Sequence, residues 1–150
     1  MDVKVKLTLT ARVYPAAAHG ADRRHAVALV TTVQRQTFNR TQIRTPVDTG
    51  NLRSHNRLGA LQASATRVTA EVFNDCEYAE AVHDGSRPHT ITANRRSRTN
   101  PNRPGALKFK IGSRTIYRRS VQHPGSAGRP WLEKAAQEVA AQNGFVFQRT

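Results

Sequence analysis

The chain has 150 residues, with 24 Lys plus Arg against 10 Asp plus Glu, so its formal net charge at pH 7 is +14. A surface this basic attracts polyanions or acidic partners, and no apolar run is long enough to predict a membrane-spanning helix. The single cysteine, Cys76, excludes an internal disulfide, and the N-terminus lacks the apolar stretch of a secretion signal. We therefore expect a protein that is made in the cytoplasm and forms a single domain over residues 1–150.

The first two predicted elements are a strand and a long helix. Apolar residues alternate with charged and polar ones from Val3 to Val13, which predicts a half-buried strand. Asp22 can cap the helix that follows. An apolar stripe at helical spacing predicts that helix over residues 23–40, and core packing is our interpretation of the stripe. Its members are Val27, Val30, Val33 and Thr37, with Ala26 and Leu29 beside them.

A turn and a hairpin come next. Pro46 and Gly50 indicate the turn, in which Gly50 permits a positive φ angle and Asp48 or Thr49 can hydrogen-bond the backbone. The turn lacks the glycine pattern and the Gly-Lys-Ser/Thr ending of a phosphate-binding loop, so we do not expect nucleotide binding. Two apolar runs joined by a short connection then predict an antiparallel hairpin. They span residues 58–64 and 67–74.

The second half of the chain predicts short elements around a basic loop. Residues 75–82 predict a helical turn ended by Gly85, and residues 86–105 are polar, basic and rich in turn residues, which predicts a mobile loop that orders on binding. A second hairpin is predicted to turn at Gly112-Ser113, and a last helix over residues 130–142. We therefore predict an α+β fold: an antiparallel or mixed sheet of about five strands, packed against the two longer helices.

The basic charge is concentrated in one stretch. No acidic residue lies between Asp84 and Glu133, and most of the cations there are arginines, which bind phosphates bidentately. The stretch could contact DNA phosphates or acidic surfaces of neighbouring subunits, whereas a generally basic composition is the simpler interpretation. Phe109 and Tyr117 are too sparse to form a base-stacking platform. The candidates for lining a DNA channel or meeting a partner are Arg95, Arg96, Arg98 and Arg103.

Two catalytic or metal-binding interpretations are weaker. Cys76 with His83, His89 and His123 could be combined into a zinc site, but their spacings match no zinc-binding unit. The same histidines with Glu80 or Asp84 could act in a metal-independent nuclease, although no spacing shows that they lie close together. We therefore expect no catalytic residues, no metal and no cofactor.

Three segments follow one another in an informative order. They are Thr45–Ser54 (TPVDTGNLRS), Tyr78–Gly85 (YAEAVHDG), and His123-Pro124-Gly125 followed by Arg129–Ala135 (RPWLEKA). This order resembles the neck or tail-completion proteins of long-tailed bacteriophages, which join a DNA-filled head to its tail. The resemblance covers about residues 21–141. The positions that match that family are Pro46, Thr49, Gly50, Leu52, Arg53, Ser54, Tyr78, Gly85, Pro130, Trp131 and Ala135.

The resemblance implies a structural role in the virion. It implies a homo-oligomeric ring, six subunits by analogy with the tail, that contacts adaptor, stopper, terminator or tail-tube proteins and meets viral DNA non-specifically. Trp131 is then a core anchor, with an interface position as the alternative. The strand near residues 3–13 precedes the helix with which the family pattern begins, and its edge could pair with a neighbour's sheet. The alternative functions are a small basic nucleic-acid-binding protein or a histidine-dependent nuclease.

Overall fold

The chain, predicted as one domain, divides into two compact units. The computed structural model describes residues 5–12, 20–93 and 105–147. Unit 1 comprises residues 1–84 and 128–150, and unit 2 comprises residues 85–127, so unit 2 is an insertion in the sequence of unit 1. No helix among the described residues is both long and apolar enough to cross a membrane.

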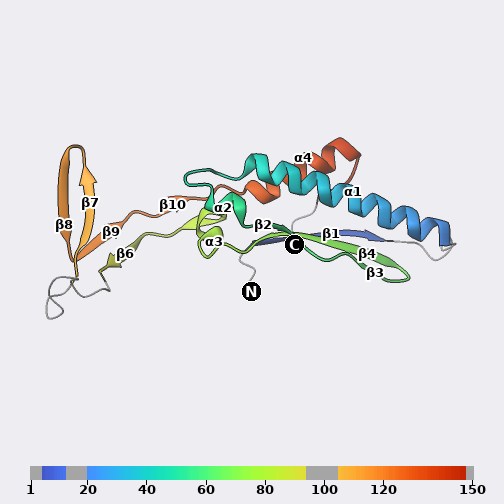
Figure 1. Ribbon diagram of the computed structural model, residues 1–150, viewed down its shortest axis with the longest axis horizontal. Helices are drawn as coiled ribbons and strands as arrows, with labels where there is room; N and C mark the ends of the chain where they lie inside the picture. The colour runs from blue at the N-terminus through green and yellow to red at the C-terminus, as the bar shows by residue number, and fades with distance from the viewer. Residues whose placement is uncertain (1–4, 13–19, 94–104, 148–150) are drawn as a thin grey trace. The chain divides into compact units, whose positions relative to one another are not determined.

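Unit 1 contains an antiparallel sheet with a long central strand. The sheet has the order β1-β4-β2, in which β1 spans Val5–Arg12, β4 spans Arg67–Asn74 and β2 spans Asn56–Leu58 (Figure 1). The short β3, Gln62–Ala63, also pairs with β4. Strand β1 pairs with β4 along its whole length, from Val5 opposite Asn74 to Arg12 opposite Arg67. The outer edge of β1 is therefore an edge of this sheet.

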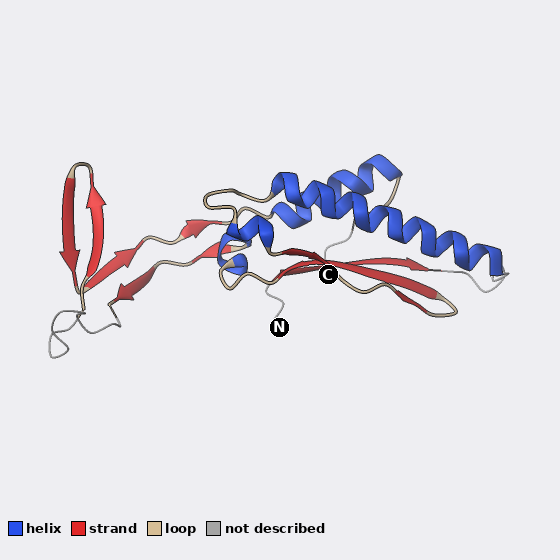
Figure 2. Cartoon of the chain, in the orientation of Figure 1, coloured by secondary structure: helices blue, strands red, loops and turns tan. Residues whose placement is uncertain are grey.

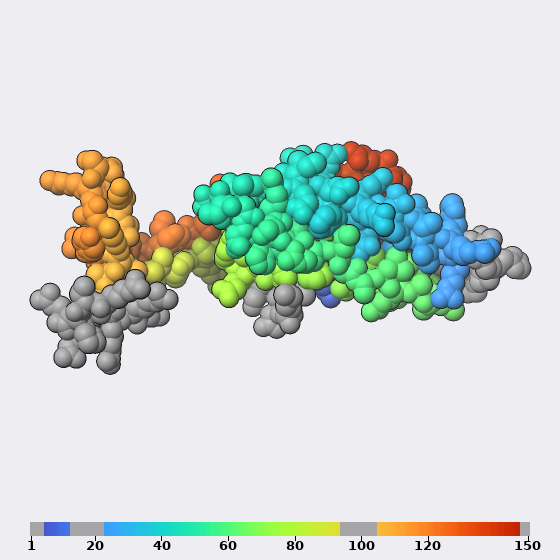
Figure 3. Space-filling view, viewed as in Figure 1, coloured from blue at the N-terminus to red at the C-terminus, as the bar shows by residue number. Residues whose placement is uncertain are grey.

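Two helices cover one face of the sheet. Helix α1 spans Gly20–Arg44 and helix α4 spans Trp131–Asn143, and they pack on each other and on β1 (Figures 1 and 2). In the space-filling view, α1 (blue to cyan) forms much of the surface of unit 1 on the side shown (Figure 3). The short helices α2, Asn51–Ser54, and α3, Ala79–His83, lie in the connections. The predicted α+β class, with both long helices packed on the sheet, is confirmed.

The two faces of the sheet differ as the sequence alternation predicts. Val68, Ala70 and Val72 of β4 are fully buried on the helix side. The opposite face is mainly polar, although Phe73 also lies on it, and Lys6 Nζ lies 3.0 Å from Glu71 Oε1 there. The core consists of two clusters of buried apolar side chains. One contains Leu52, Val72, Cys76, Ala79, Trp131 and Leu132, and the other contains Val30, Val68 and Ala70.

Helix α1 is longer than the predicted 23–40. It begins at Gly20, which places Asp22 inside its first turn, and it continues to Arg44. The buried face continues past Thr37 through Thr41, both at 0 % exposure. Sequence periodicity missed this last turn because polar residues occupy its buried positions, where apolar ones would mark a helix. The members of the predicted stripe also differ in burial, since Leu29 is 38 % exposed.

The described residues of unit 2 form three separate pairs of antiparallel strands. None of its described residues is buried. The predicted hairpin is present, with a two-residue turn at Gly112-Ser113. The pairs are β5 (Gly85–Ser86) with β10 (Ser126–Ala127), β6 (His89–Thr92) with β9 (Ser120–His123), and β7 (Leu107–Ile111) with β8 (Arg114–Arg118).

The prediction of a loop over residues 86–105 is wrong for its first part. Ser86 belongs to β5, and residues 89–92 form β6. Their partners, β10 and β9, lie about 30 to 40 residues further along the chain. A local composition argument does not detect such distant pairing. Residues 94–104, which include Arg95, Arg96, Arg98 and Arg103, lie outside the described residues.

We predict that Trp131→Ala lowers the free energy of unfolding by about 3–5 kcal/mol, because the side chain is 2 % exposed and its removal leaves a cavity in the main core cluster. Urea denaturation followed by circular dichroism measures the change. The exposed Gln137 on the same helix provides the control, because Gln137→Ala is expected to change stability by less than about 0.5 kcal/mol. A loss below 1 kcal/mol for Trp131→Ala would contradict the core assignment.

Candidate functional site

The turn that resembles the phage family connects α1 to the sheet. Gly50 has φ +85°, the left-handed region that we predicted for it, and its carbonyl accepts the Ser54 N–H at 3.0 Å. The backbone N–H of Asn51 donates to Thr49 Oγ1 at 3.4 Å, so Thr49 makes the predicted side-chain contact with the turn. Leu52 is 5 % exposed and belongs to the main core cluster. Pro46 is half-buried, and Arg53 and Ser54 are exposed.

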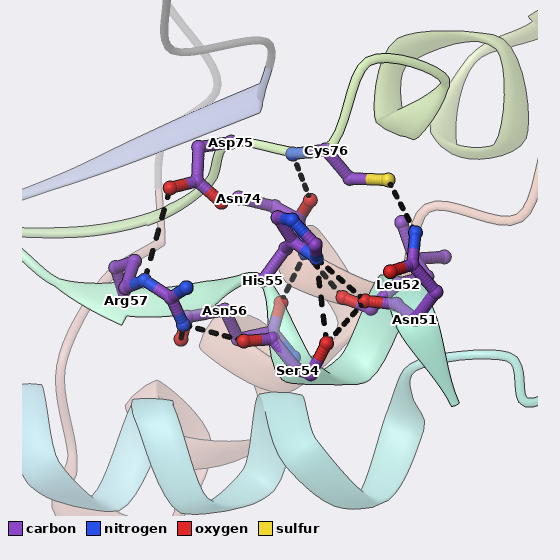
Figure 4. A network of polar contacts seen from close by, with 9 residues as sticks. All are labelled: Asn51, Leu52, Ser54, His55, Asn56, Arg57, Asn74, Asp75 and Cys76. Atoms are coloured by element: carbon purple, nitrogen blue, oxygen red, sulfur yellow. Dashed lines mark hydrogen bonds and ion pairs between the residues drawn. The ribbon is translucent and has the colours of Figure 1, made fainter. Parts of the chain in front are cut away.

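A buried asparagine holds this turn against the sheet. Asn74, at the end of β4, is fully buried. Figure 4 shows its side chain among the polar contacts of the turn. Its amide nitrogen donates to Leu52 O at 2.8 Å and to Asn56 Oδ1 at 2.7 Å, and its side-chain oxygen accepts the Cys76 N–H at 3.0 Å. One side chain therefore links α2, β2 and the segment that leads to α3.

The network continues into helix α1. Asn56 donates to Thr45 Oγ1 at 2.8 Å, and Thr45 Oγ1 donates to Thr41 O at 2.7 Å. Nearer the N-terminus of the helix, Gln34 donates to two backbone carbonyls, Gly59 O at 2.9 Å and Glu71 O at 2.8 Å. These bonds fix the polar side of α1 on the sheet. We did not predict the network, although Asn74 continues the buried alternation of Val68, Ala70 and Val72, which is the signal that points to it.

A surface patch lies where the turn meets the segment before α3. The two segments are joined by a hydrogen bond from Asn51 Nδ2 to the Tyr78 hydroxyl at 3.1 Å. Val47 and Tyr78 are 54 % and 43 % exposed, which is high for apolar and aromatic side chains. Exposed carboxylates lie beside them in the sequence of both segments. We call this surface the turn patch, and its members are Val47, Asp48, Glu77, Tyr78 and Glu80.

The junction of α3 and α4 is a second closely packed region of unit 1. His83, 5 % exposed, packs edge-on against Trp131 with ring centroids 4.9 Å apart. Its Nδ1 lies 2.7 Å from Asp84 Oδ1. The Arg129 N–H donates to Val82 O at 2.9 Å just before Pro130, which precedes α4, and Ala135 of α4 is fully buried. Trp131 is therefore a core anchor, as we interpreted it.

Gly128 allows the chain to close at this junction. A Cβ atom at position 128 would lie 2.7 Å from the carbonyl oxygen of Asp84, closer than real side chains approach a backbone atom. The residue before the insertion and the residue after it therefore meet in unit 1.

The residues considered for catalysis or zinc binding are divided between the two units. Cys76 and His83 are buried in unit 1, whereas His89 and His123 are a cross-strand pair in unit 2 with ring centroids 5.1 Å apart. The described residues contain no group of three or more His, Cys, Asp or Glu side chains that could hold a metal ion. His83 has a carboxylate partner in Asp84, but its ring is enclosed by the core.

A groove in unit 1 offers mainly apolar surface. It has a volume of about 410 Å³ and lies among α1, β1, α4 and residues 145–147. Thr37 lines it, and the Thr37 hydroxyl has no hydrogen-bond partner in the described part of the chain. No titratable side chain lines the groove among the described residues, so it supplies no acid–base group there.

The β7–β8 hairpin of unit 2 has two chemically different faces. Directly opposed residues share a face. One face pairs Leu107 with Arg118, Phe109 with Ile116, and Ile111 with Arg114. The other face pairs Lys108 with Tyr117 and Lys110 with Thr115. One side of the hairpin is therefore apolar with an arginine at each end, and the other side is polar and cationic. We call the first side the arm face.

Comparison with known proteins finds no matching family model, and no curated protein or solved structure matches the chain.

We predict that Asn74→Ala destabilises the protein by about 2–4 kcal/mol, because it leaves Leu52 O, Asn56 Oδ1 and the Cys76 N–H buried without their partner. Chemical denaturation measures the effect. Asn39→Ala, at an exposed position of α1, serves as the control and is expected to change stability by less than about 0.5 kcal/mol. Equal effects of the two substitutions would contradict the central role of Asn74.

We also predict that the two units of the free monomer differ in hydrogen exchange. Isolated two-stranded pairs are marginally stable in water, so amides of β6–β9 and β7–β8 are expected to exchange at rates close to those of an unstructured peptide. Amides of β4, between buried side chains, are expected to exchange far more slowly. Mass spectrometry of exchanged peptides compares them, and equal protection of the two units would show that unit 2 is stable without a partner.

Proposed function

We propose that this chain is a structural virion protein of the head–tail connector, or neck, of a long-tailed bacteriophage. In this role it forms a ring that completes the tail and joins it to the DNA-filled head. The support from sequence is the order of the turn, the Tyr-Ala…Gly segment and the closing Trp-Leu helix. The support from structure is that the turn, α3 and α4 all contribute side chains to the main core cluster of unit 1.

The observation that carries the proposal is that unit 2 is strongly basic and has no buried residue among those described. Its sequence holds ten Lys or Arg residues and no Asp or Glu. Its described residues form only two-stranded pairs, and none of them is buried. Such pairs need a further surface to become stable. An insertion of this kind is suited to binding a neighbouring molecule, and its described residues enclose no site for a small substrate.

A ring of identical subunits would meet the same requirement. A surface on one subunit that docks on a different surface of the next gives a closed ring when the rotation between them closes. The resemblance implies six subunits, with adaptor, stopper, terminator or tail-tube proteins above and below. The cationic residues of unit 2 would then meet these proteins or the DNA that passes through the ring. We expect no catalysis and no cofactor in this role.

The second candidate is a small nucleic-acid-binding protein or a nuclease. The observation that favours it is the pair of His89 and His123 on one face of β6–β9, within a basic unit. In the described structure, His89 Nδ1 contacts Arg87 O at 2.9 Å and His123 Nδ1 accepts the Gly125 N–H at 3.1 Å. Both rings are thus oriented by backbone groups, and unit 2 contains no carboxylate to raise the basicity of either one.

We predict that disrupting this gene in the parent phage produces filled heads and separate tails. Electron microscopy of the lysate shows the particles directly. Adding back the purified protein is expected to join heads to tails and to restore infectious particles, whereas buffer alone does not.

A control separates the alternatives. His89→Ala/His123→Ala protein is expected to restore joining as well as the wild type, because the proposed role uses no acid–base chemistry. Normal virions from the disrupted phage would contradict the connector role. Loss of a nucleic-acid cleavage activity in the double variant would establish the nuclease instead.

A further inference from the structure

The turn patch contains the described carboxylates that have no partner among the described residues. Among the side chains that the structure describes, Glu71, Asp75, Asp84 and Glu138 lie within ion-pair distance of a basic group, and Glu133 also has an interaction. The remaining carboxylates, Asp48, Glu77 and Glu80, have none, and all belong to the turn patch. In a protein with a net charge of +14, it is unexpected that all three lie in two segments that a hydrogen bond joins, from Asn51 to Tyr78.

The patch is also partly apolar. Val47 and Tyr78 are next to Asp48 and Glu77 in the sequence, and about half of the surface of each is exposed. Within the two segments, residues 47–54 and 77–80, the three carboxylates outnumber the one cation, the exposed Arg53. An exposed aromatic ring with a carboxylate on either side in the sequence, at Glu77 and Glu80, is suited to bind an apolar surface that carries arginines.

The arm face presents the complementary arrangement. Leu107, Phe109 and Ile116 form its centre and are only half-buried, and Ile111 is 61 % exposed. Arg118 and Arg114 lie at its two ends, opposite Leu107 and Ile111. Unit 2 has no carboxylate with which these arginines could pair. The described residues of unit 2 therefore do not bury the arm face, and the unit has no counter-charge for its arginines.

We propose that the arm face of one copy docks on the turn patch of a second copy of this chain. Leu107, Phe109 and Ile116 would cover Val47 and Tyr78, and Arg114 and Arg118 would pair with Glu77 and Glu80. The inference rests on the proposed function, because it identifies the surfaces that build the ring. The two surfaces are different, so the contact is head-to-tail and repeats around a closed ring.

The apolar centre of the arm face favours a protein partner over DNA. Phosphate backbones attract cations but offer no surface that buries leucine, phenylalanine and isoleucine. The opposite face, with Lys108 and Lys110, has no such apolar centre. It remains available to DNA or to another partner when the arm face is covered. The two faces of one hairpin thus have separate roles.

Charge reversal of the full-length protein tests the contact. We expect Arg114→Glu/Arg118→Glu to raise the protein concentration needed for half-maximal self-association by at least about tenfold, measured by sedimentation velocity, because close charge pairs at interfaces couple strongly. Glu77→Arg/Glu80→Arg is expected to have a similar effect. Combining all four substitutions in one chain is expected to restore self-association, since the pairs are then re-formed with opposite sign.

The matched control lies on the same hairpin. Lys108→Glu/Lys110→Glu changes the formal charge by the same amount on the opposite face, and we expect self-association close to that of the wild type. Equal loss with both hairpin variants would show a general charge effect and overturn the docking proposal. The proposal would also be overturned by a four-substitution chain that stays dissociated or by a wild type that is monomeric at every concentration.

Two further measurements separate this proposal from its premise. If the gene-disrupted phage yields filled heads and separate tails but the charge-reversed chains still self-associate, the connector role stands and the contact is wrong. If short duplex DNA binds the wild type, and Arg114→Glu/Arg118→Glu weakens that binding while self-association is unchanged, the arm face binds DNA instead. Circular dichroism of each variant checks that unit 1 is folded.

Discussion

The hydrogen bonds of Asn74 are the constraint on which the rest of unit 1 depends. A fully buried amide at the end of the central strand satisfies backbone groups of α2 and of the segment before α3, and through Asn56 it reaches helix α1. A buried polar group is costly unless it is paired, so this arrangement is satisfied in one register of the turn on the sheet. Apolar contacts alone would tolerate several registers. The polar network therefore determines how the turn and Tyr78 are presented at the surface.

Much of unit 1 could be predicted from sequence because its elements follow local periodicity. The alternation in β1 and β4 and the apolar faces of α1 and α4 each reflect a single buried face. The end of α1 could not be predicted in this way, since Thr41 and Thr45 occupy buried positions with polar groups. The positive φ of Gly50 was predictable from the turn sequence. The partners of Asn74 were not, because they come from three separate segments.

For unit 2, the sequence predicts properties that depend on composition but not the pairing of its strands. Its composition predicts exposure and basic charge correctly, and its described residues are indeed unburied. Composition does not predict the strand pairing of residues 89–92 with 120–123, because this register depends on a distant segment. The turn patch was also missed. Its carboxylates are unremarkable in sequence and become distinctive only when the structure shows that the other described carboxylates are engaged.

The meeting of Asp84 and Gly128 has a consequence for how such a protein changes over time. The chain leaves unit 1 at Asp84 and returns to it at Gly128, and these two residues are in contact. Unit 1 therefore does not need to change its conformation when unit 2 is longer or shorter. Each doubling of loop length adds only about 0.6 kcal/mol of closure entropy. A single contiguous stretch of gene can thus be exchanged for another while the folded body is kept. One recombination event at this place therefore changes what unit 2 can bind while unit 1 stays as it is.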